Sequence, residues 1–181
     1  MSGFKKELNE KGQLSQTQKF KIEKIETNVA ATLKAGGILR HGGNRPQGFD
    51  AGYYYAPTVI ECPSPELAAV EEEMFGPVLS VLRFTDEDEV IAKANDTRYG
   101  LAGGIFTRDI GRALRVAKRL RNGITWINTY RVVSPVAPFG GFKMSGHGRE
   151  SGLDSVHDYT RTKTIWINTS DAPMADPFVM R

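Results

Sequence analysis

The sequence predicts an α/β protein in which helices cover a parallel β-sheet. Three short segments, 77–84, 101–107 and 123–128, are apolar along nearly their whole length. Each gap between them holds a segment whose apolar residues recur at helical spacing. Strands that helices bury on both faces have this near-continuous apolar character, whereas strands with one wet face alternate. The order strand, helix, strand, helix, strand therefore indicates a parallel sheet with covering helices.

The first predicted element is a helix that follows Ser15. Ser15 with Gln18 three residues later is the capping-box pattern of a helix N-terminus, and the glycines at 36–37 end the helix. The apolar residues between these signals recur every three or four positions: Ile22, Ile25, Val29 and Leu33. A strand at 38–43 and an extended segment at 53–62 are expected next, joined by a turn.

The regular α/β part follows a loop and a short helix that ends near Glu73. The apolar strand 77–84 leads to Thr85, which with Asp88 predicts a capped helix whose apolar side includes 90–95. The strand 101–107 precedes a second helix, and the apolar stripe of this helix is Ala113, Val116, Ala117 and Leu120.

Two segments lie where such a fold places ligands. Open α/β sheets bind ligands at the carboxyl ends of their strands, and both 71–78 and the loop 131–152 adjoin predicted strands. The loop is rich in Gly, Pro and Ser, and an irregular loop of this length in a compact domain is more often functional than idle. The segment 162–170 alternates like one last strand.

Charge gives little support for a nucleic-acid partner. The net charge is small, 24 − 21 = +3 in 181 residues. The densest basic cluster is a predicted helix face that carries Arg112, Arg115 and Arg119. No aromatic interleaving or base-reading motif accompanies it, so the solvated face of an amphipathic helix is favoured over a nucleic-acid surface.

A membrane role and a secreted scaffold are also disfavoured. No apolar run approaches the length of a membrane span, and the first residues include no apolar signal region. A single cysteine excludes an internal disulfide. We therefore expect a cytoplasmic protein without a membrane partner.

Few residues suggest covalent or metal chemistry. Cys62 follows an apolar strand and precedes a proline, with no histidine or basic cluster nearby, so a structural cysteine is favoured over a nucleophile. The three histidines, at 41, 147 and 157, show no metal-ligand spacing, and no metal site is expected. The Gly-rich run 140–148 matches neither a P-loop nor a dinucleotide fingerprint.

The octapeptide EEEMFGPV, at 71–78, is the most informative stretch. Its three glutamates cannot all face one site, because neighbours on a helix point about a hundred degrees apart. One inward carboxylate beside Phe75, at a Gly-Pro corner, suits a sugar diol and a flat heterocycle. A surface helix end followed by a core phenylalanine explains the same residues equally well, so both interpretations stay open at this point.

Four motifs in order resemble the aldehyde dehydrogenase superfamily: EEEMFGPV, NDTRYGLAGGIFT, GITWINTY and PFGGFKMSGHGRE. The resemblance runs from about residue 15 to about residue 167. It implies an α/β fold of the aldehyde dehydrogenase catalytic-domain type, with a C-terminal β-strand for oligomerisation. The domains expected from it are a partial catalytic domain at 1–159 and an oligomerisation strand with a tail at 160–181.

The resemblance also assigns site residues. Glu73 matches the family glutamate that holds the nicotinamide ribose hydroxyls, and Phe75 matches the ring beside the nicotinamide. The expected cofactor is therefore NAD or NADP, and the expected partners are an aldehyde substrate and further copies of the chain. The positions that match the lining of the aldehyde entrance are Asn128, Tyr130, Arg131, Val133 and Phe139.

No catalytic residue is assigned to this chain. The family nucleophile is a cysteine in a Gly-Gln-x-Cys setting upstream of EEEMFGPV, and nothing here matches it, nor the general-base glutamate, the oxyanion-hole asparagine or the dinucleotide-binding domain. Without a thiolate to attack the aldehyde carbon, the covalent step is missing. We expect a C-terminal segment of an NAD(P)-dependent aldehyde dehydrogenase that is inactive alone. The alternative is a non-catalytic assembly or binding module derived from that family.

Overall fold

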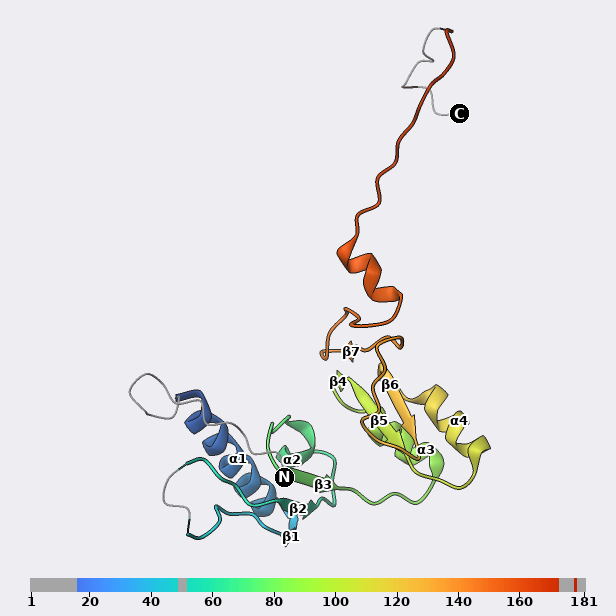
Figure 1. Cartoon of the computed structure of the whole chain (residues 1–181). Helices are drawn as coiled ribbons and strands as arrows, with labels where there is room; N and C mark the ends of the chain where they lie inside the picture. The colour runs from blue at the N-terminus through green and yellow to red at the C-terminus, as the bar shows by residue number, and fades with distance from the viewer. Residues whose placement is uncertain (1–15, 49–51, 173–177, 179–181) are drawn as a thin grey trace. The chain divides into compact units, whose positions relative to one another are not determined.

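The computed structural model describes residues 16–48, 52–172 and 178, and these fall into two compact units (Figure 1). The first unit contains the described residues up to 98 together with 107–121, and the second contains 99–106 and the described residues from 122 onward. Ser15, the expected cap of the first helix, lies outside the described residues.

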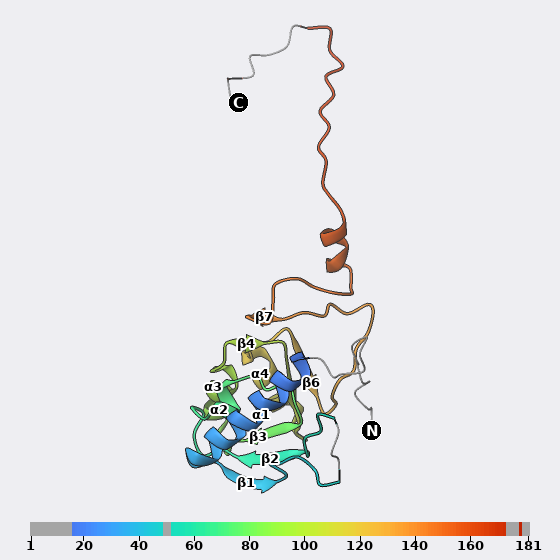
Figure 2. The same ribbon diagram turned by 90° about the vertical axis from the view of Figure 1, so that its left-hand side faces the viewer.

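The first unit is built on a three-stranded sheet with the strand order β1-β2-β3. The long helix α1 (Gln16–Lys34) precedes β1 (Ile38–His41), which pairs antiparallel with β2 (Thr58–Glu61). After the four-residue helix α2 (Ala68–Glu71), β3 (Val78–Val81) pairs parallel with β2. Helix α1 lies along one side of this sheet (Figure 2).

The core of this unit lies between α1, β2 and the segment around α2. The expected apolar stripe of α1 is confirmed, since Ile22, Ile25 and Val29 are buried. Ile60 and Cys62 meet them from β2 and its end, and Leu67 and Met74 close the cluster. Met74 in this core therefore anchors the middle of the EEEMFGPV stretch against α1 and β2.

A buried hydroxyl on α1 supplies the cap that α2 lacks. Leu67, the N-cap of α2, has no side-chain acceptor. The Oγ1 of Thr32 instead accepts a hydrogen bond from the amide of Ala69 at 2.9 Å and donates to the carbonyl of Asn28 at 2.7 Å. An unpaired amide at a buried helix end would be costly, so Thr32 holds the start of α2 against α1.

Helices α3 (Glu87–Asn95) and α4 (Ile110–Arg119) complete the first unit. The sequence predicts Thr85 as the cap of α3, but the cap is Asp86, which accepts from the amide of Glu89 at 2.9 Å. The Glu89 carboxylate reaches back to the amide and hydroxyl of Thr85, both at 2.7 Å. The capping-box chemistry is thus present one residue later, because two neighbouring residues could both serve as caps.

The basic face of α4 pairs with the first turn of α3. Arg115 forms two hydrogen bonds to Glu87, at 3.2 and 3.0 Å, and Arg119 donates to Asp88 at 2.7 Å. Arg112 approaches Glu87 at 3.6 Å. The fold therefore accounts for the densest cluster of positive charge as one side of a helix–helix contact.

The second unit contains two pairs of short strands. Strand β5 (Ala102–Ile105) pairs parallel with β6 (Ile124–Ile127), and β4 (Tyr99–Gly100) pairs antiparallel with β7 (Phe142–Lys143). A 3-10 helix, η1 (Asp154–Tyr159), follows. The single parallel sheet predicted from the sequence is therefore corrected to three smaller sheets, with parallel pairing at β2–β3 and β5–β6.

The segment 162–170 differs from the strand predicted for it. Residues 160–171 are assigned neither helix nor strand (Figure 1). Their side chains are exposed. A strand is defined by its hydrogen-bonded neighbour, and alternation in the sequence supplies two faces but no neighbour. The division into 1–159 and 160–181 stays a prediction.

None of the helices in the described ranges combines the length and the apolar character that a membrane crossing requires.

Candidate functional site

The three consecutive glutamates have separate positions. Helix α2 ends at Glu71, which is exposed, and Glu72 turns back toward the fold. The Glu72 carboxylate accepts from Arg98 at 2.9 Å and lies 3.7 Å from the ammonium group of Lys24. Glu72 therefore has a structural ion pair, which leaves Glu73 as the exposed carboxylate next to Met74.

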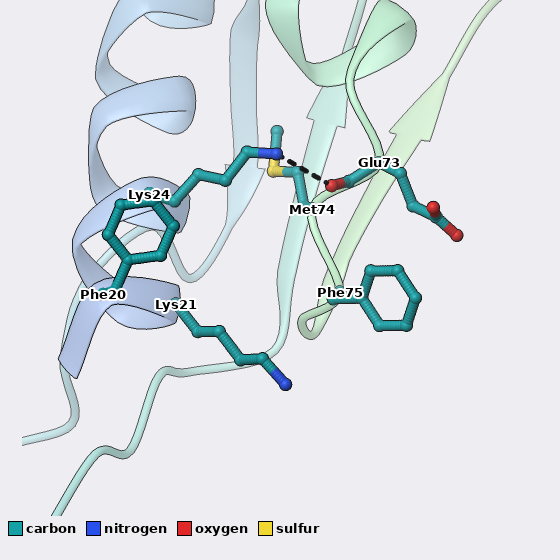
Figure 3. Close-up of a pocket in the computed structure, with 6 residues that line it drawn as sticks. All are labelled: Phe20, Lys21, Lys24, Glu73, Met74 and Phe75. Atoms are coloured by element: carbon teal, nitrogen blue, oxygen red, sulfur yellow. Dashed lines mark hydrogen bonds between the residues drawn. The ribbon is translucent and has the colours of Figure 1, made fainter. Parts of the chain in front are cut away.

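Glu73 and Phe75 point to the same side of the chain. Met74 between them is 8% exposed and belongs to the core, whereas the Phe75 ring is 72% exposed. Figure 3 shows the Met74 side chain toward α1 and the Glu73 carboxylate and Phe75 ring on the opposite side. The interpretation of Phe75 as a core residue is therefore wrong, because Met74 fills that place.

The backbone at this corner has little freedom. Phe75 has a φ of 50°, in the left-handed region that non-glycine residues rarely adopt. At Gly76 an added Cβ would come within 2.3 Å of the Cδ1 atom of Ile25, so a larger residue there would force the Ile25 side chain to shift. The corner thus fixes the direction in which the Phe75 ring projects.

A hollow of about 370 Å³ lies beside this corner. Its lining consists of Phe20, Lys21, Lys24, Glu73, Met74 and Phe75 (Figure 3). The Lys24 ammonium donates to the carbonyl oxygen of Glu73 at 3.4 Å. Phe20, Lys21 and Lys24 line the hollow from α1, whereas the Glu73 carboxylate and the Phe75 ring project away from α1 at its edge (Figure 3).

Sequence reasoning missed the contribution of α1 to this hollow. Phe20 and Lys24 are four residues apart and therefore share one helix face. Helical spacing could have grouped them, but only the fold shows that this face borders EEEMFGPV.

A second group of assigned residues follows β6 in the second unit, and one of them contacts Trp126. The amide of Asn128, just after β6, donates to the carbonyl of Ile105 at 2.8 Å. The Tyr130 ring packs edge-on against Trp126 with 5.4 Å between ring centroids, and the Arg131 guanidinium lies 5.8 Å from the Tyr130 centroid. Three sequence-predicted entrance residues therefore lie together at the carboxyl end of β6.

Trp126 itself was not predicted as a site residue. Its indole Nε1 donates to the carbonyl of Val132 at 2.9 Å, which ties the following loop to the strand. The signal was present as the one aromatic residue in the strand GITWIN, but an aromatic residue in an apolar strand indicates core as readily as a site.

The other two predicted entrance residues are placed differently. Val133 is exposed on the loop, and Phe139 is half-buried. The main chain of Phe139 pairs with that of Glu150, with N–O distances of 2.7 and 2.6 Å. Phe139 is thus fixed by the Gly-rich part of the loop, and the structure gives no contact that joins it to the Trp126 group.

The Gly-rich part of the loop requires its glycines for close backbone packing. A side chain on Gly123 would overlap the carbonyl oxygen of Gly140, and one on Gly140 would overlap the carbonyl oxygen of Gly148. Gly141 is buried against Ser145. These contacts explain why the sequence concentrates glycine here, although no phosphate-binding motif matches.

Cys62 does not have the surroundings of a nucleophile. It is 2% exposed, and its thiol points toward the carbonyl of Ile60 at 3.7 Å. Burial raises the pKa of the Cys62 thiol, which disfavours the reactive thiolate. The expectation of a structural cysteine is therefore supported. In the described part of the chain, no group of His, Cys, Asp and Glu is arranged to hold a metal ion.

The sequence profile described as the aldehyde dehydrogenase family matches residues 5–165. The chain belongs to the aldehyde dehydrogenase family. The resemblance read from the four motifs is thereby confirmed.

Curated relatives within the family agree. The chain is 52% identical over 160 residues to (Z)-2-((N-methylformamido)methylene)-5-hydroxybutyrolactone dehydrogenase of Acinetobacter baylyi, a match that covers 88% of this chain and 32% of that protein. It is 45% identical over 162 residues to betaine aldehyde dehydrogenase of Mesorhizobium japonicum, with coverage of 88% and 33%. The chain thus spans about a third of the length of these aldehyde dehydrogenases.

Solved structures confirm the α/β fold of the family. PnpE from a Pseudomonas species matches with a TM-score of 0.80 and 38% identity, over 88% of this chain and 33% of that one. An aldehyde dehydrogenase of Mycobacterium tuberculosis, solved in complex with NAD+, matches with a TM-score of 0.79 and 36% identity, over 90% and 33%.

Proposed function

We propose that this chain is the C-terminal segment of an NAD(P)-dependent aldehyde dehydrogenase that oxidises an aldehyde to a carboxylic acid. In this proposal the segment supplies a clamp for the cofactor, made of Glu73 and Phe75, and part of the aldehyde entrance. The observation that carries it is the common direction of the Glu73 carboxylate and the Phe75 ring at a corner fixed by Met74 and Gly76.

The residues at the corner fit a nicotinamide cofactor. An ionised carboxylate accepts hydrogen bonds from two neighbouring hydroxyls, and bonds of this charged kind contribute about 1.5–3 kcal/mol each. Phe75 offers a ring face to a flat heterocycle, and its exposed ring lies on the same side of the chain as the Glu73 carboxylate (Figure 3). When bound, the cofactor would supply the hydride acceptor; Glu73 and Phe75 would orient it.

The proposed aldehyde entrance is formed by the assigned loop residues. Tyr130 packs against Trp126, Arg131 lies over the Tyr130 ring, and Asn128 comes directly after β6. Val133 and Phe139 follow on the same loop. Aromatic and apolar side chains with a few polar groups are typical of pockets for small organic ligands. The identity of the aldehyde and the choice between NAD and NADP are not assigned.

The segment alone is expected not to oxidise aldehydes. The covalent mechanism needs a thiolate, and Cys62, the chain's only cysteine, is buried with a raised pKa. Purified chain mixed with aldehydes and NAD or NADP should therefore form no reduced cofactor. Turnover that Cys62→Ala abolishes would contradict this expectation.

We propose further that copies of the complete enzyme associate through residues 162–168. The apolar side chains Ile165, Trp166 and Ile167 are exposed there, and an apolar segment of this kind is expected to be covered in the assembled protein. A non-catalytic assembly module is the alternative that the same exposed segment favours. A cytoplasmic location stays a prediction.

The cofactor clamp is tested by Glu73→Gln in a complete enzyme that contains this segment. The amide still bonds one hydroxyl but holds the ribose less firmly, so the nicotinamide is aimed less well. We expect single-turnover hydride transfer to slow by about 10- to 100-fold, with the KM for aldehyde nearly unchanged.

Glu71→Gln is the matched control, because Glu71 is an exposed neighbour at the end of α2. It should leave hydride transfer at the wild-type rate. A wild-type rate in Glu73→Gln as well would remove the clamp assignment.

A further inference from the structure

Arg149 occupies a cradle of backbone carbonyls in the second unit. Its Nη1 atom donates to the carbonyls of Gly141 and Gly148, both at 2.9 Å, and to that of His147 at 3.4 Å. Its guanidinium carbon lies 5.5 Å from the centroid of the Phe142 ring. A planar cation over an aromatic face and among several acceptors is held in one orientation.

The neighbouring backbone leaves room for this side chain. A Cβ atom on Gly140 would come within 2.8 Å of Arg149 Cδ and 2.9 Å of Arg149 Nη1. The same atom would overlap the carbonyl oxygen of Gly148. The absence of a side chain at Gly140 therefore lets the guanidinium reach the carbonyl of Gly141 on the opposite arm of the loop.

The cradle adjoins the main-chain pair that holds Phe139. Glu150 follows Arg149 directly, and Phe139 and Glu150 exchange hydrogen bonds of 2.7 and 2.6 Å. The amide of Gly152 donates to the carbonyl of Pro135 at 3.0 Å, which joins the same two arms once more. The two arms of the loop thus meet at the Phe139–Glu150 pair, and Glu150 directly follows the arginine.

We propose that Arg149 is a positioning residue, a tethered cation whose hydrogen bonds to the loop carbonyls hold the segment 139–150 closed and thereby fix Phe139. Removal of the guanidinium leaves carbonyl oxygens of the cradle without their donor and loosens the Phe139–Glu150 pair. That this pair orders the aldehyde entrance rests on the proposed function. The proposal that Arg149 holds the loop closed rests only on the hydrogen bonds described above.

The first test uses this chain and measures hydrogen exchange at the amides of Phe139 and Glu150. Arg149→Met keeps a long side chain but removes the cation and its donors. We expect exchange at both amides to become about tenfold faster, the change that corresponds to about 1.4 kcal/mol of loop stability. Arg108→Met, at an exposed arginine outside the loop and outside the association segment, is the matched control and should exchange like the wild type.

Chemical rescue distinguishes a cation in the cradle from general loss of packing. The rescue uses Arg149→Ala, which leaves the space of the side chain empty. Guanidinium chloride at tens of millimolar, far below denaturing concentrations, should restore slow exchange in Arg149→Ala, and potassium chloride at equal ionic strength should not. Wild-type exchange in Arg149→Met, or equal effects of the two salts, would overturn the proposal. Should Arg149→Met fail to fold, Arg149→Lys is measured in the same way. We expect its two amides to exchange faster than in the wild type, and exchange at the wild-type rate would overturn the proposal.

The second test uses the complete enzyme and separates KM from kcat. Arg149→Met should raise the KM for aldehyde by about tenfold while single-turnover hydride transfer at saturating aldehyde stays close to wild type. A merely destabilised enzyme would lose kcat at unchanged KM, and that result overturns the role at the entrance. If Glu73→Gln leaves hydride transfer at the wild-type rate while Arg149→Met speeds amide exchange, the cofactor clamp is wrong and the role of Arg149 in the loop still holds.

Discussion

At the residue scale, three of the assigned site residues share an uncommon backbone conformation. Phe75, Asn128 and Arg131 have φ angles of 50°, 54° and 60°. The left-handed region costs a non-glycine residue about 1–2 kcal/mol, and such strain persists where the surroundings fix it, often at functional sites. The same strain at both proposed sites is consistent with the assignments, because it aims side chains that would otherwise turn elsewhere.

The sequence could predict the type of these residues but not their exposure. The spacing of EEEMFGPV left open whether Phe75 or a neighbour is buried, since a phenylalanine and a methionine suit a core equally well. Contact with α1 decides it, because Met74 fills the space beside Ile25 and Val29. Long-range contacts of this kind are not encoded in the spacing of eight residues.

The buried thiol of Cys62 predicts a pH dependence of stability. Burial raises its pKa in the folded chain, so the unfolded chain loses the proton first, near pH of about 8.5. The contribution of the thiol is therefore full below that pH and is lost as the pH rises toward the folded pKa. Urea unfolding between about pH 7 and pH 10 should show a steeper loss of stability in wild type than in Cys62→Ala.

Tyr55, whose pKa burial also raises, is present in both proteins and cancels in this comparison. We expect Cys62→Ala to cost about 1 kcal/mol at neutral pH, because the removed sulfur leaves a small cavity. Parallel pH profiles for the two proteins would contradict the raised pKa.

At the element scale, strands and helices were predicted well and their pairing was not. The apolar runs and the helical stripes mark β3, β5, β6, α3 and α4. Pairing depends on which strand lies next to which, and the strands β4 and β7, of two residues each, are too short to give any periodic signal. The three small sheets therefore could not be read from the sequence.

The close packing of the Gly-rich loop against the start of β6 predicts that a larger residue at Gly123 lowers stability. Gly123, just before β6, faces the carbonyl oxygen of Gly140, and an added Cβ would overlap it. Gly123→Ala must push two backbones apart and should lower the free energy of unfolding by about 1–3 kcal/mol in urea denaturation. Gly148→Ala is the control, since an added Cβ there meets nothing within 4 Å. It should change stability by less than about 0.5 kcal/mol, and equal losses in both variants would refute this view of the loop.

At the scale of the whole molecule, many of the charged side chains form ion pairs with one another within the fold. Hydrogen bonds from Arg83 and Arg40 lower the pKa of Glu61 to about 2. Hydrogen bonds from Arg115 lower the pKa of Glu87, and Lys93 and Thr85 lower that of Glu89 to about 2. Each of these carboxylates favours the folded state above its unfolded pKa, and this contribution is lost as the pH falls through the folded value.

Residues 162–168 have the sequence pattern of a strand but no strand neighbour among the described residues. The alternation in 162–168 predicts a strand, with Ile165 on one face and Trp166 on the other. In the structure these residues have no strand assignment, and Ile165, Trp166 and Ile167 are 70%, 92% and 79% exposed. An apolar segment with strand-like alternation that has no strand neighbour in the part of the chain that the structure describes favours pairing with another chain.

We therefore expect the 181-residue chain to form dimers or larger species in sedimentation velocity at micromolar concentration. Ile165→Pro should weaken this association, because proline removes an amide donor from the ladder as well as the apolar side chain. Ile165→Thr is the matched control: it removes most of the apolar surface but keeps the amide and a β-branched side chain, so it should associate more strongly than Ile165→Pro. If both variants weaken the association equally, the contact between chains depends on apolar surface and not on the amide of residue 165. A monomeric wild type, or an assembly indifferent to the proline, would show that residues 162–168 do not join the subunits.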